Sequence, residues 1–210
     1  MSGITAAVAG ATGLVGNLLL KRLLADPEVA RVTAPTRRPL AQHPKLSNPK
    51  FDGRSWPELP ALDEAYGCLG TTRKTAGSDE RFRAVDLDLT RSFARAARAA
   101  GAKRFGLVSS LGADARSRFL YPRTKGEAEA AISGSGFESV AIVRPSFLVG
   151  ERAEHRSGER FMIVAFQLLK PVIPRRWRAV GADAVAASLI GAVRGRVPGT
   201  LILESDVLHG

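Results

Sequence analysis

Short apolar runs alternate along this chain with longer segments in which apolar residues recur at the spacing of a helix. Apolar, β-branched runs predict buried parallel strands, and an apolar period of three to four residues predicts helices packed on a sheet. Leu14, Leu18, Leu19 and Leu23 mark the first helix in this way. The predicted strands are residues 4–9, 31–36, 50–52, 65–70, 104–109, 140–143 and 200–203, and the further predicted helices are residues 79–100, 122–133, 159–170 and 183–193.

This alternation predicts an α/β fold, a doubly wound parallel sheet of the Rossmann type, as a single domain over residues 1–210. We expect a cofactor and catalytic core over residues 1–150, a short substrate or lid segment over 151–181, and a returning helix and strand over 182–210. Such sheets bind ligands beyond the carboxyl ends of their strands, where the strand order reverses. Chemically active residues are therefore expected directly after the strands.

Three glycines follow the first predicted strand at a three-residue spacing and open the first helix. Gly10 permits a tight turn, Gly13 lets a ligand approach the backbone, and Gly16 lets the helix pack closely on the strand. The free N–H groups and the positive dipole end of the helix then point at one place, where a pyrophosphate binds. The sequence thus predicts a dinucleotide site, and a glycine-rich turn that holds nothing is the alternative.

The end of the second predicted strand indicates which dinucleotide is bound. NAD sites usually place a carboxylate there for the ribose diol, whereas residues 36–39 of this chain contain Arg37 and Arg38 and no acidic residue. Two guanidinium groups can clamp a 2′-phosphate through charge-assisted hydrogen bonds. The predicted cofactor is NADP(H), and a pair of solvated loop arginines is the alternative.

Tyr121 and Lys125 lie four residues apart, on one face of a predicted helix, one strand-to-helix step after Ser109 and Ser110. An ammonium group stabilises a phenolate, so the tyrosine can transfer a proton while the lysine holds the nicotinamide ribose. Neighbouring strand residues point to opposite sides, so one serine is expected to orient a substrate carbonyl, and Ser110 is favoured. Pro122 predicts that the helix begins there. An exposed helix start is the alternative explanation of the Tyr/Lys pair.

Composition narrows the other possibilities. The net charge of +11 admits nucleic acid as a minor alternative, but the arginines are spread along the chain and no nucleic-acid-binding motif is present. Cys68 is the only cysteine, which excludes an intrachain disulfide and favours a reducing cytoplasm. We expect a cytoplasmic protein without a leader, a membrane span or a metal site, because the first predicted strand starts at residue 4, the apolar run 161–169 is short, and no ligand cluster has metal spacing.

Several motifs in combination resemble the atypical short-chain dehydrogenase/reductases, and in particular the Tat-interacting protein family of NADP-binding oxidoreductase-like proteins and its bacterial relatives. The resemblance covers about the first 150 residues. Larger sugar-nucleotide epimerases carry Asn and Gly where this chain has Asp86 and Leu89. The motifs are GATGLVG at 10–16, CLGTT at 68–72, AGS at 76–78, SSLGAD at 109–114, FLYPRTKGE at 119–127 and RPS at 144–146.

The resemblance implies that Tyr121 and Lys125 are the catalytic pair and that Pro145 lies near the nicotinamide. The pyrophosphate would be held by Thr12, Gly13, Leu14 and Val15, the 2′-phosphate by Arg37 and Arg38, and the cofactor would also contact Leu69, Gly70 and Thr71.

The predicted function is therefore an NADP(H)-dependent oxidoreductase that transfers a hydride to or from a small carbonyl or alcohol. The short segment after residue 150 favours a small substrate over a sugar nucleotide. A non-catalytic module that senses NADP(H) and regulates or binds another protein is the alternative. The sequence leaves open a homodimer or another protein partner.

Overall fold

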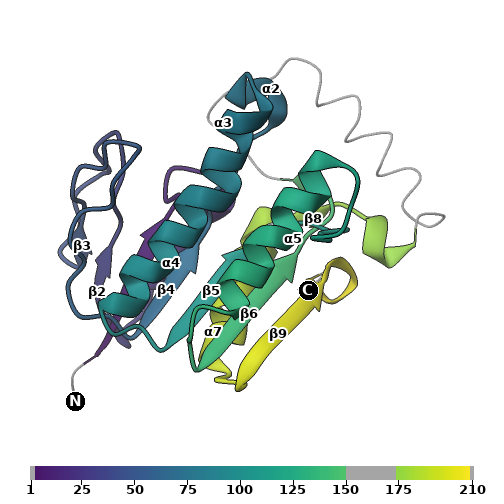
Figure 1. The fold of residues 1–210 in the computed structure, drawn as a ribbon. Helices are drawn as coiled ribbons and strands as arrows, with labels where there is room; N and C mark the ends of the chain where they lie inside the picture. Colours follow the sequence, from purple (N-terminus) through teal and green to yellow (C-terminus); the bar gives the residue numbers. More distant parts are fainter. Residues whose placement is uncertain (1–2, 150–173, 209–210) are drawn as a thin grey trace.

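In the computed structural model, residues 3–149 and 174–208 are described, and they form a seven-stranded parallel sheet (Figure 1). The strand order is β3-β2-β1-β4-β5-β6-β9, so the order reverses between β1 and β4. The carboxyl ends of parallel strands share one edge of the sheet, and the switch point lies there. The strands are β1 (Ile4–Ala9), β2 (Val29–Thr33), β3 (Leu46–Ser47), β4 (Glu64–Gly67), β5 (Arg104–Val108), β6 (Ser139–Arg144) and β9 (Gly199–Glu204).

Helices cover both faces of the sheet. Helices α1 (Leu14–Ala25) and α7 (Ala182–Arg194) pack together on one face, and α4 (Thr90–Ala99) and α5 (Leu120–Ser133) lie on the other (Figure 1). Alternate residues of β1 supply the two cores: Ala6 and Val8 join the α1–α7 cluster, and Ala7 and Ala9 join the α4 cluster. The predicted doubly wound α/β fold is confirmed.

Six of the seven predicted strands have other bounds in the structure, because pairing between distant segments sets them. The predicted strand 31–36 is β2, which ends at Thr33, and the predicted strand 65–70 is β4, which ends at Gly67. The predicted third strand, 50–52, is wrong: Lys50 forms only an isolated bridge with Thr36, and β3 lies earlier. The Ala34 amide donates to the carbonyl of Ser47 at 2.9 Å, a long-range bond that the local pattern does not reveal.

The predicted helix 79–100 consists of three parts: α3 (Asp79–Arg83), the π-helix η1 (Ala84–Leu89) and α4. A π-turn inserts one residue into the helical hydrogen-bond pattern and often occurs at functional sites. The predicted start of the next helix at Pro122 is wrong, since α5 begins at Leu120. Proline is tolerated in the first turn because the N–H groups there have no intrahelical acceptor.

Shorter elements complete the described part of the chain. They are α2 (Arg73–Ala76), the paired strands β7 (Leu148–Val149) and β8 (Val180–Gly181), and the 3-10 turns η2 (Arg175–Trp177) and η3 (Ser205–Leu208). The predicted helix 159–170, and most of the predicted substrate segment 151–181, lie outside the described residues. Among the helices that the structure does describe, none has both the length and the apolar composition needed to cross a bilayer.

Candidate functional site

The glycine turn after β1 is packed directly against the end of β4. Gly10 has a φ of +82°, and a Cβ atom there would lie 2.4 Å from the carbonyl oxygen of Cys68. A Cβ atom at Gly16 would lie 2.1 Å from the carbonyl oxygen of Gly10. Both distances are far below van der Waals contact with backbone atoms, so only glycine fits these two positions.

The amino end of α1 is open to an anion. Gly13 is the N-cap residue, no side chain caps the helix, and its first turn contains no acidic residue. The first N–H groups of the helix therefore have neither a side-chain acceptor nor a neighbouring negative charge. Thr12 and Gly13 are exposed, whereas Val15 is buried and offers only its backbone. This arrangement fits a pyrophosphate, whose oxygens bind backbone N–H groups.

Arg37 and Arg38 lie on the surface, beyond the end of β2 and therefore beside the strand that leads into the glycine turn. Their turn is fixed by the buried Thr36, whose Oγ1 donates to the carbonyl oxygen of Arg38 at 2.6 Å. Asn48 Nδ2 in turn donates to Thr36 Oγ1 at 2.8 Å. The two guanidinium groups are thus attached to an ordered backbone at the sheet edge where the glycine turn lies.

Lys125 reaches from α5 to the loop after β4. Its Nζ lies 2.6 Å from Oδ1 of Asp86, and both side chains are almost completely buried. The other oxygen of Asp86, Oδ2, accepts from the backbone amide of Thr71 at 2.9 Å. A Cβ atom at Gly70 would lie 3.7 Å from both Lys125 Nζ and Asp86 Oδ1. The structure therefore brings the predicted residues Gly70, Thr71 and Lys125 together, and Leu69 adjoins them, half-buried.

Asp86 was not among the predicted site residues. It occupies the π-helix between α3 and α4, which turns its carboxylate inward to the lysine. One signal was available in the sequence, because Asp86 falls on the same helical stripe as Phe82 and Thr90, which are both buried. A carboxylate on a buried stripe requires a buried partner. The sequence alone does not say which residue that partner is.

Tyr121 lies in the first turn of α5, one turn before Lys125, and its side chain is 40% exposed. Its ring stacks on the buried ring of Phe82, with ring centroids 5.7 Å apart and planes inclined by 25°. The stacking fixes the direction of the phenol while leaving part of it accessible. Tyr121 and Lys125 thus lie on the same turn-to-turn face of α5, as the sequence predicted.

The two serines after β5 differ in their surroundings. Ser109 is buried, and its Oγ donates to Oε1 of Glu129 at 2.5 Å. Arg144 donates to the same carboxylate through Nε at 2.9 Å and Nη2 at 2.6 Å, and to Glu204 through Nη1 at 2.8 Å. The hydrogen bonds that Arg144 donates to Glu129 raise the pKa of Arg144 above its ordinary value. Ser109 is therefore engaged in a buried ionic network.

Ser110, in contrast, is half-buried, and its hydroxyl donates only to the carbonyl oxygen of Leu111 at 3.3 Å, a long and weak bond. Pro145, at the end of β6, is buried, and its carbonyl oxygen accepts from the Leu111 amide at 2.9 Å. Pro145 thus ties the end of β6 to the loop that carries Ser110. The predicted residues Ser110 and Pro145 meet through this loop.

Cys68 lies next to the glycine turn. Burial raises the pKa of the Cys68 thiol to about 12, so it stays protonated at neutral pH and serves as packing beneath Gly10. Within residues 3–149 and 174–208, no group of three or more His, Cys, Asp or Glu side chains could hold a metal ion.

Comparison with known proteins agrees with this geometry. Residues 10–161 match the model of a family described as NAD(P)H-binding. The chain is 38% identical over 210 residues to the mitochondrial protein fmp52 of Emericella nidulans, covering 91% of this chain and 90% of that protein. It is also 38% identical over 161 residues to the protein HTATIP2 of Rattus norvegicus, covering 72% of this chain and 66% of that protein.

Among solved structures, that of MoeE5 in complex with UDP-glucose and NAD is similar, with a TM-score of 0.71 and 20% identity. The match covers 95% of this chain and 75% of MoeE5, and it shows a shared fold. The match to the NAD(P)H-binding family shows a nicotinamide-cofactor domain, as the glycine turn predicted.

The predicted cytoplasmic location is contradicted by the fungal relatives, because several proteins of the fmp52 group carry the word mitochondrial in their names. The prediction used the single cysteine, Cys68, and the absence of a visible leader. A free thiol indicates a reducing environment, and more than one compartment provides it. Cysteine content therefore could not identify the compartment.

Proposed function

Because the chain belongs to the NAD(P)H-binding family, among the atypical short-chain dehydrogenase/reductases related to the Tat-interacting proteins, we propose that it is an NADP(H)-dependent oxidoreductase acting on a small carbonyl or alcohol. The observation that carries this proposal is the position of Lys125. Its ammonium lies beside Gly70, in the same loop whose residue Cys68 supports the turn at Gly10. The proposal puts the candidate proton-transfer pair and the candidate phosphate turn at the same edge of the sheet.

The preference for NADP(H) over NAD(H) is supported by Arg37 and Arg38. Both are exposed at the end of β2, where a carboxylate would otherwise bind the ribose diol, and the Thr36 hydrogen bonds order their backbone. A 2′-phosphate carries the charge and the oxygens that two guanidinium groups bind in a bidentate manner.

The nicotinamide of the bound cofactor supplies or accepts the hydride. In the direction of reduction, Tyr121 would donate its phenolic proton to the carbonyl oxygen as the carbonyl carbon receives the hydride. Lys125 would stabilise the resulting phenolate by its charge and would bind the cofactor ribose. Ser110 would hydrogen-bond the carbonyl oxygen and orient it, since Ser109 is held by Glu129. In oxidation, the same groups act in reverse.

The cofactor assignment is tested by calorimetric titration with NADPH and NADH. We expect NADPH to bind more tightly than NADH. Arg37→Ala should weaken the binding of NADPH by roughly tenfold or more and leave the affinity for NADH nearly unchanged, because one charge-assisted contact with the 2′-phosphate is lost. Arg31→Ala is the matched control, since Arg31 is an exposed arginine on β2 itself. Tighter binding of NADH by the wild type would refute the NADP(H) assignment.

Catalysis is tested with Tyr121→Phe, which keeps the ring against Phe82 and removes only the hydroxyl. We expect the NADPH affinity to stay within a factor of two and the rate of NADPH oxidation by a panel of small aldehydes and ketones to fall by about 10²–10⁴-fold. An unchanged rate would refute the proton-transfer role. Tight NADPH binding with no turnover of any carbonyl or alcohol by the wild type would favour the NADP(H)-sensing alternative.

A further inference from the structure

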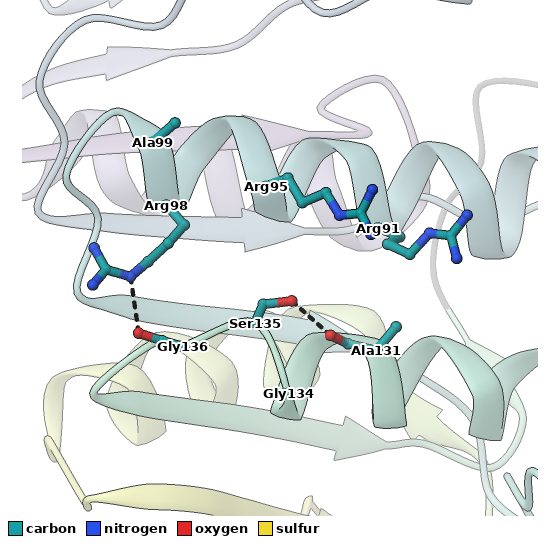
Figure 2. Close-up of a pocket in the computed structure, with 8 residues that line it drawn as sticks. All are labelled: Arg91, Arg95, Arg98, Ala99, Ala131, Gly134, Ser135 and Gly136. Carbon is teal, nitrogen blue, oxygen red and sulfur yellow. Dashed lines mark hydrogen bonds between the residues drawn. The ribbon is translucent and has the colours of Figure 1, made fainter.

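A second concave surface lies between α4 and the end of α5, and we call it the arginine groove (Figure 2). It is an open hollow of about 740 Å³, a volume within the usual range of small-molecule sites. Three guanidinium groups and no carboxylate line it, and its other walls are small residues that leave the space unfilled. The lining residues are Arg91, Arg95, Arg98, Ala99, Ala131, Gly134, Ser135 and Gly136.

The three arginines lie along one side of α4. Their spacing of four and then three residues puts them on adjacent turns of one helical face, spread over about 10 Å of helix. Figure 2 shows Arg91 and Arg95 extending in the same direction along α4, while Arg98 reaches across to Gly136. Like charges at this spacing repel one another, so the arrangement favours an anion between them.

The contacts that these side chains make within the protein leave most of their donors free for a ligand. Arg98 donates through Nε to the carbonyl oxygen of Gly136 at 2.8 Å, which fixes its side chain and engages one of its three nitrogens among the described residues. Arg91 Nη2 lies 3.3 Å from Oδ1 of Asp88, in an exposed pair that contributes little. A guanidinium has five N–H donors, so each of the two can still bind an anion.

The arginine groove is separate from the candidate cofactor site. Helix α4 ends at Ala99 and leads into β5 at Arg104, and α5 ends at Ser133 and leads into β6 at Ser139. The last turns of both helices therefore lie toward the amino ends of the strands. The glycine turn lies at the carboxyl ends, so a dinucleotide bound there would not fill the groove.

We propose that the arginine groove binds a small soluble ligand that carries two or more adjacent phosphate groups. The guanidinium fork matches phosphate oxygens in a bidentate manner, and three arginines along one groove match clustered phosphates better than a single carboxylate. A second copy of the chain is a poorer occupant, because a two-fold interface would place the same three cations opposite one another. This site is independent of the proposed oxidoreductase activity.

The probe is inorganic tripolyphosphate, titrated calorimetrically into the full chain already saturated with NADPH, so that the phosphate sites of the cofactor turn are filled. We expect one molecule to bind per chain, with an affinity that falls as salt rises. The double variant Arg91→Gln with Arg95→Gln should bind at least about tenfold more weakly, because charge-assisted bonds are lost. Arg95→Lys keeps the charge and loses the fork, so it should weaken binding by a smaller factor.

The control is the double variant Lys21→Gln with Arg31→Gln, which removes two exposed positive charges elsewhere on the surface. It should bind tripolyphosphate as the wild type does. No binding by the wild type, or equal loss in both double variants, would overturn the proposal. Stronger binding to vesicles containing a phosphoinositide than to tripolyphosphate would overturn the assignment to a soluble ligand. Circular dichroism checks that every variant is folded.

Discussion

The contact between Gly16 and Gly10 makes Gly16→Ala a sharp test of the phosphate turn. The added Cβ would lie 2.1 Å from the carbonyl oxygen and 2.8 Å from the carbonyl carbon of Gly10. Carbon and oxygen atoms normally meet at about 3.3 Å or more, so the turn and α1 must separate by roughly 1 Å. Both atoms belong to the backbone, and no side-chain rotation can relieve the clash.

Two opposing terms set the size of the effect on stability. Replacing glycine by alanine inside a helix normally stabilises it by about 0.5–1 kcal/mol. Forcing an extra carbon into a packed site costs about 1–3 kcal/mol. We therefore expect Gly16→Ala to lower the free energy of unfolding by roughly 1–2 kcal/mol, or the Tm by about 2–8 °C. Displacement of the turn should also weaken the binding of NADPH by about tenfold or more, because charge-assisted bonds to phosphate are lengthened.

Gly191→Ala is the matched control for this prediction. Gly191 lies inside α7, and a Cβ atom there would have no neighbour within 4 Å. The same substitution should then raise the free energy of unfolding by about 0.5–1 kcal/mol and leave the NADPH affinity unchanged. Urea unfolding and calorimetric titration measure both quantities. If the two variants shift stability in the same direction, or if Gly16→Ala binds NADPH like the wild type, the packing argument is refuted.

Three other predictions follow from buried or paired groups. Asp86→Ala leaves the Lys125 ammonium buried without its partner, so the free energy of unfolding, measured in urea, should fall by about 3–5 kcal/mol. Adding Lys125→Met should restore most of this loss, and no recovery would contradict the pairing. Because burial raises the pKa of Cys68 to about 12, iodoacetamide should label the native thiol at pH 8 roughly 10³-fold more slowly than the unfolded chain, and equal rates would contradict this. Arg194 lowers the pKa of Asp26 below 3.8, so this carboxylate stabilises the fold above that pH and loses its effect as pH falls through the lowered value. The stability difference between wild type and Asp26→Asn should accordingly be constant near neutral pH and shrink below about pH 4, as measured by urea unfolding; a difference that grows in acid would contradict the sign.

The features that the sequence predicted well depend on local spacing. Gly16 is fixed by the geometry of one turn, because its Cβ would meet the Gly10 carbonyl oxygen, and the shared face of Tyr121 and Lys125 follows from the pitch of one helix. The doubly wound parallel sheet also followed, because alternating strands and helices with right-handed crossovers permit few arrangements. In each of these cases, neighbours in the sequence supply the information that determines the structure.

The features that it did not predict depend on partners far along the chain. The ion pair between Asp86 and Lys125 joins residues on different helices, so the periodicity of either helix does not reveal the partner. The position of β3 depends on its pairing with β2. Glu64, at the start of β4, is a charged residue of the kind usually found on the surface, and yet it is fully buried. Its carboxylate is paired there, because Nη2 of Arg104 lies 3.3 Å from Oε2 and the hydroxyl of Tyr66 donates to Oε1 at 2.9 Å.

The serine pair shows how a local rule and a distant contact combine. Alternation along a strand indicates that Ser109 and Ser110 face opposite sides, but it does not say which side holds the substrate. The carboxylate of Glu129 distinguishes them, because it accepts from Ser109 and is itself fixed by Arg144. The hydroxyl of Ser109 is engaged by this carboxylate, which leaves Ser110 as the predicted substrate contact. Arg144, which belongs to a motif that carries the family resemblance, therefore acts in this chain by joining β6 to α5 and β9.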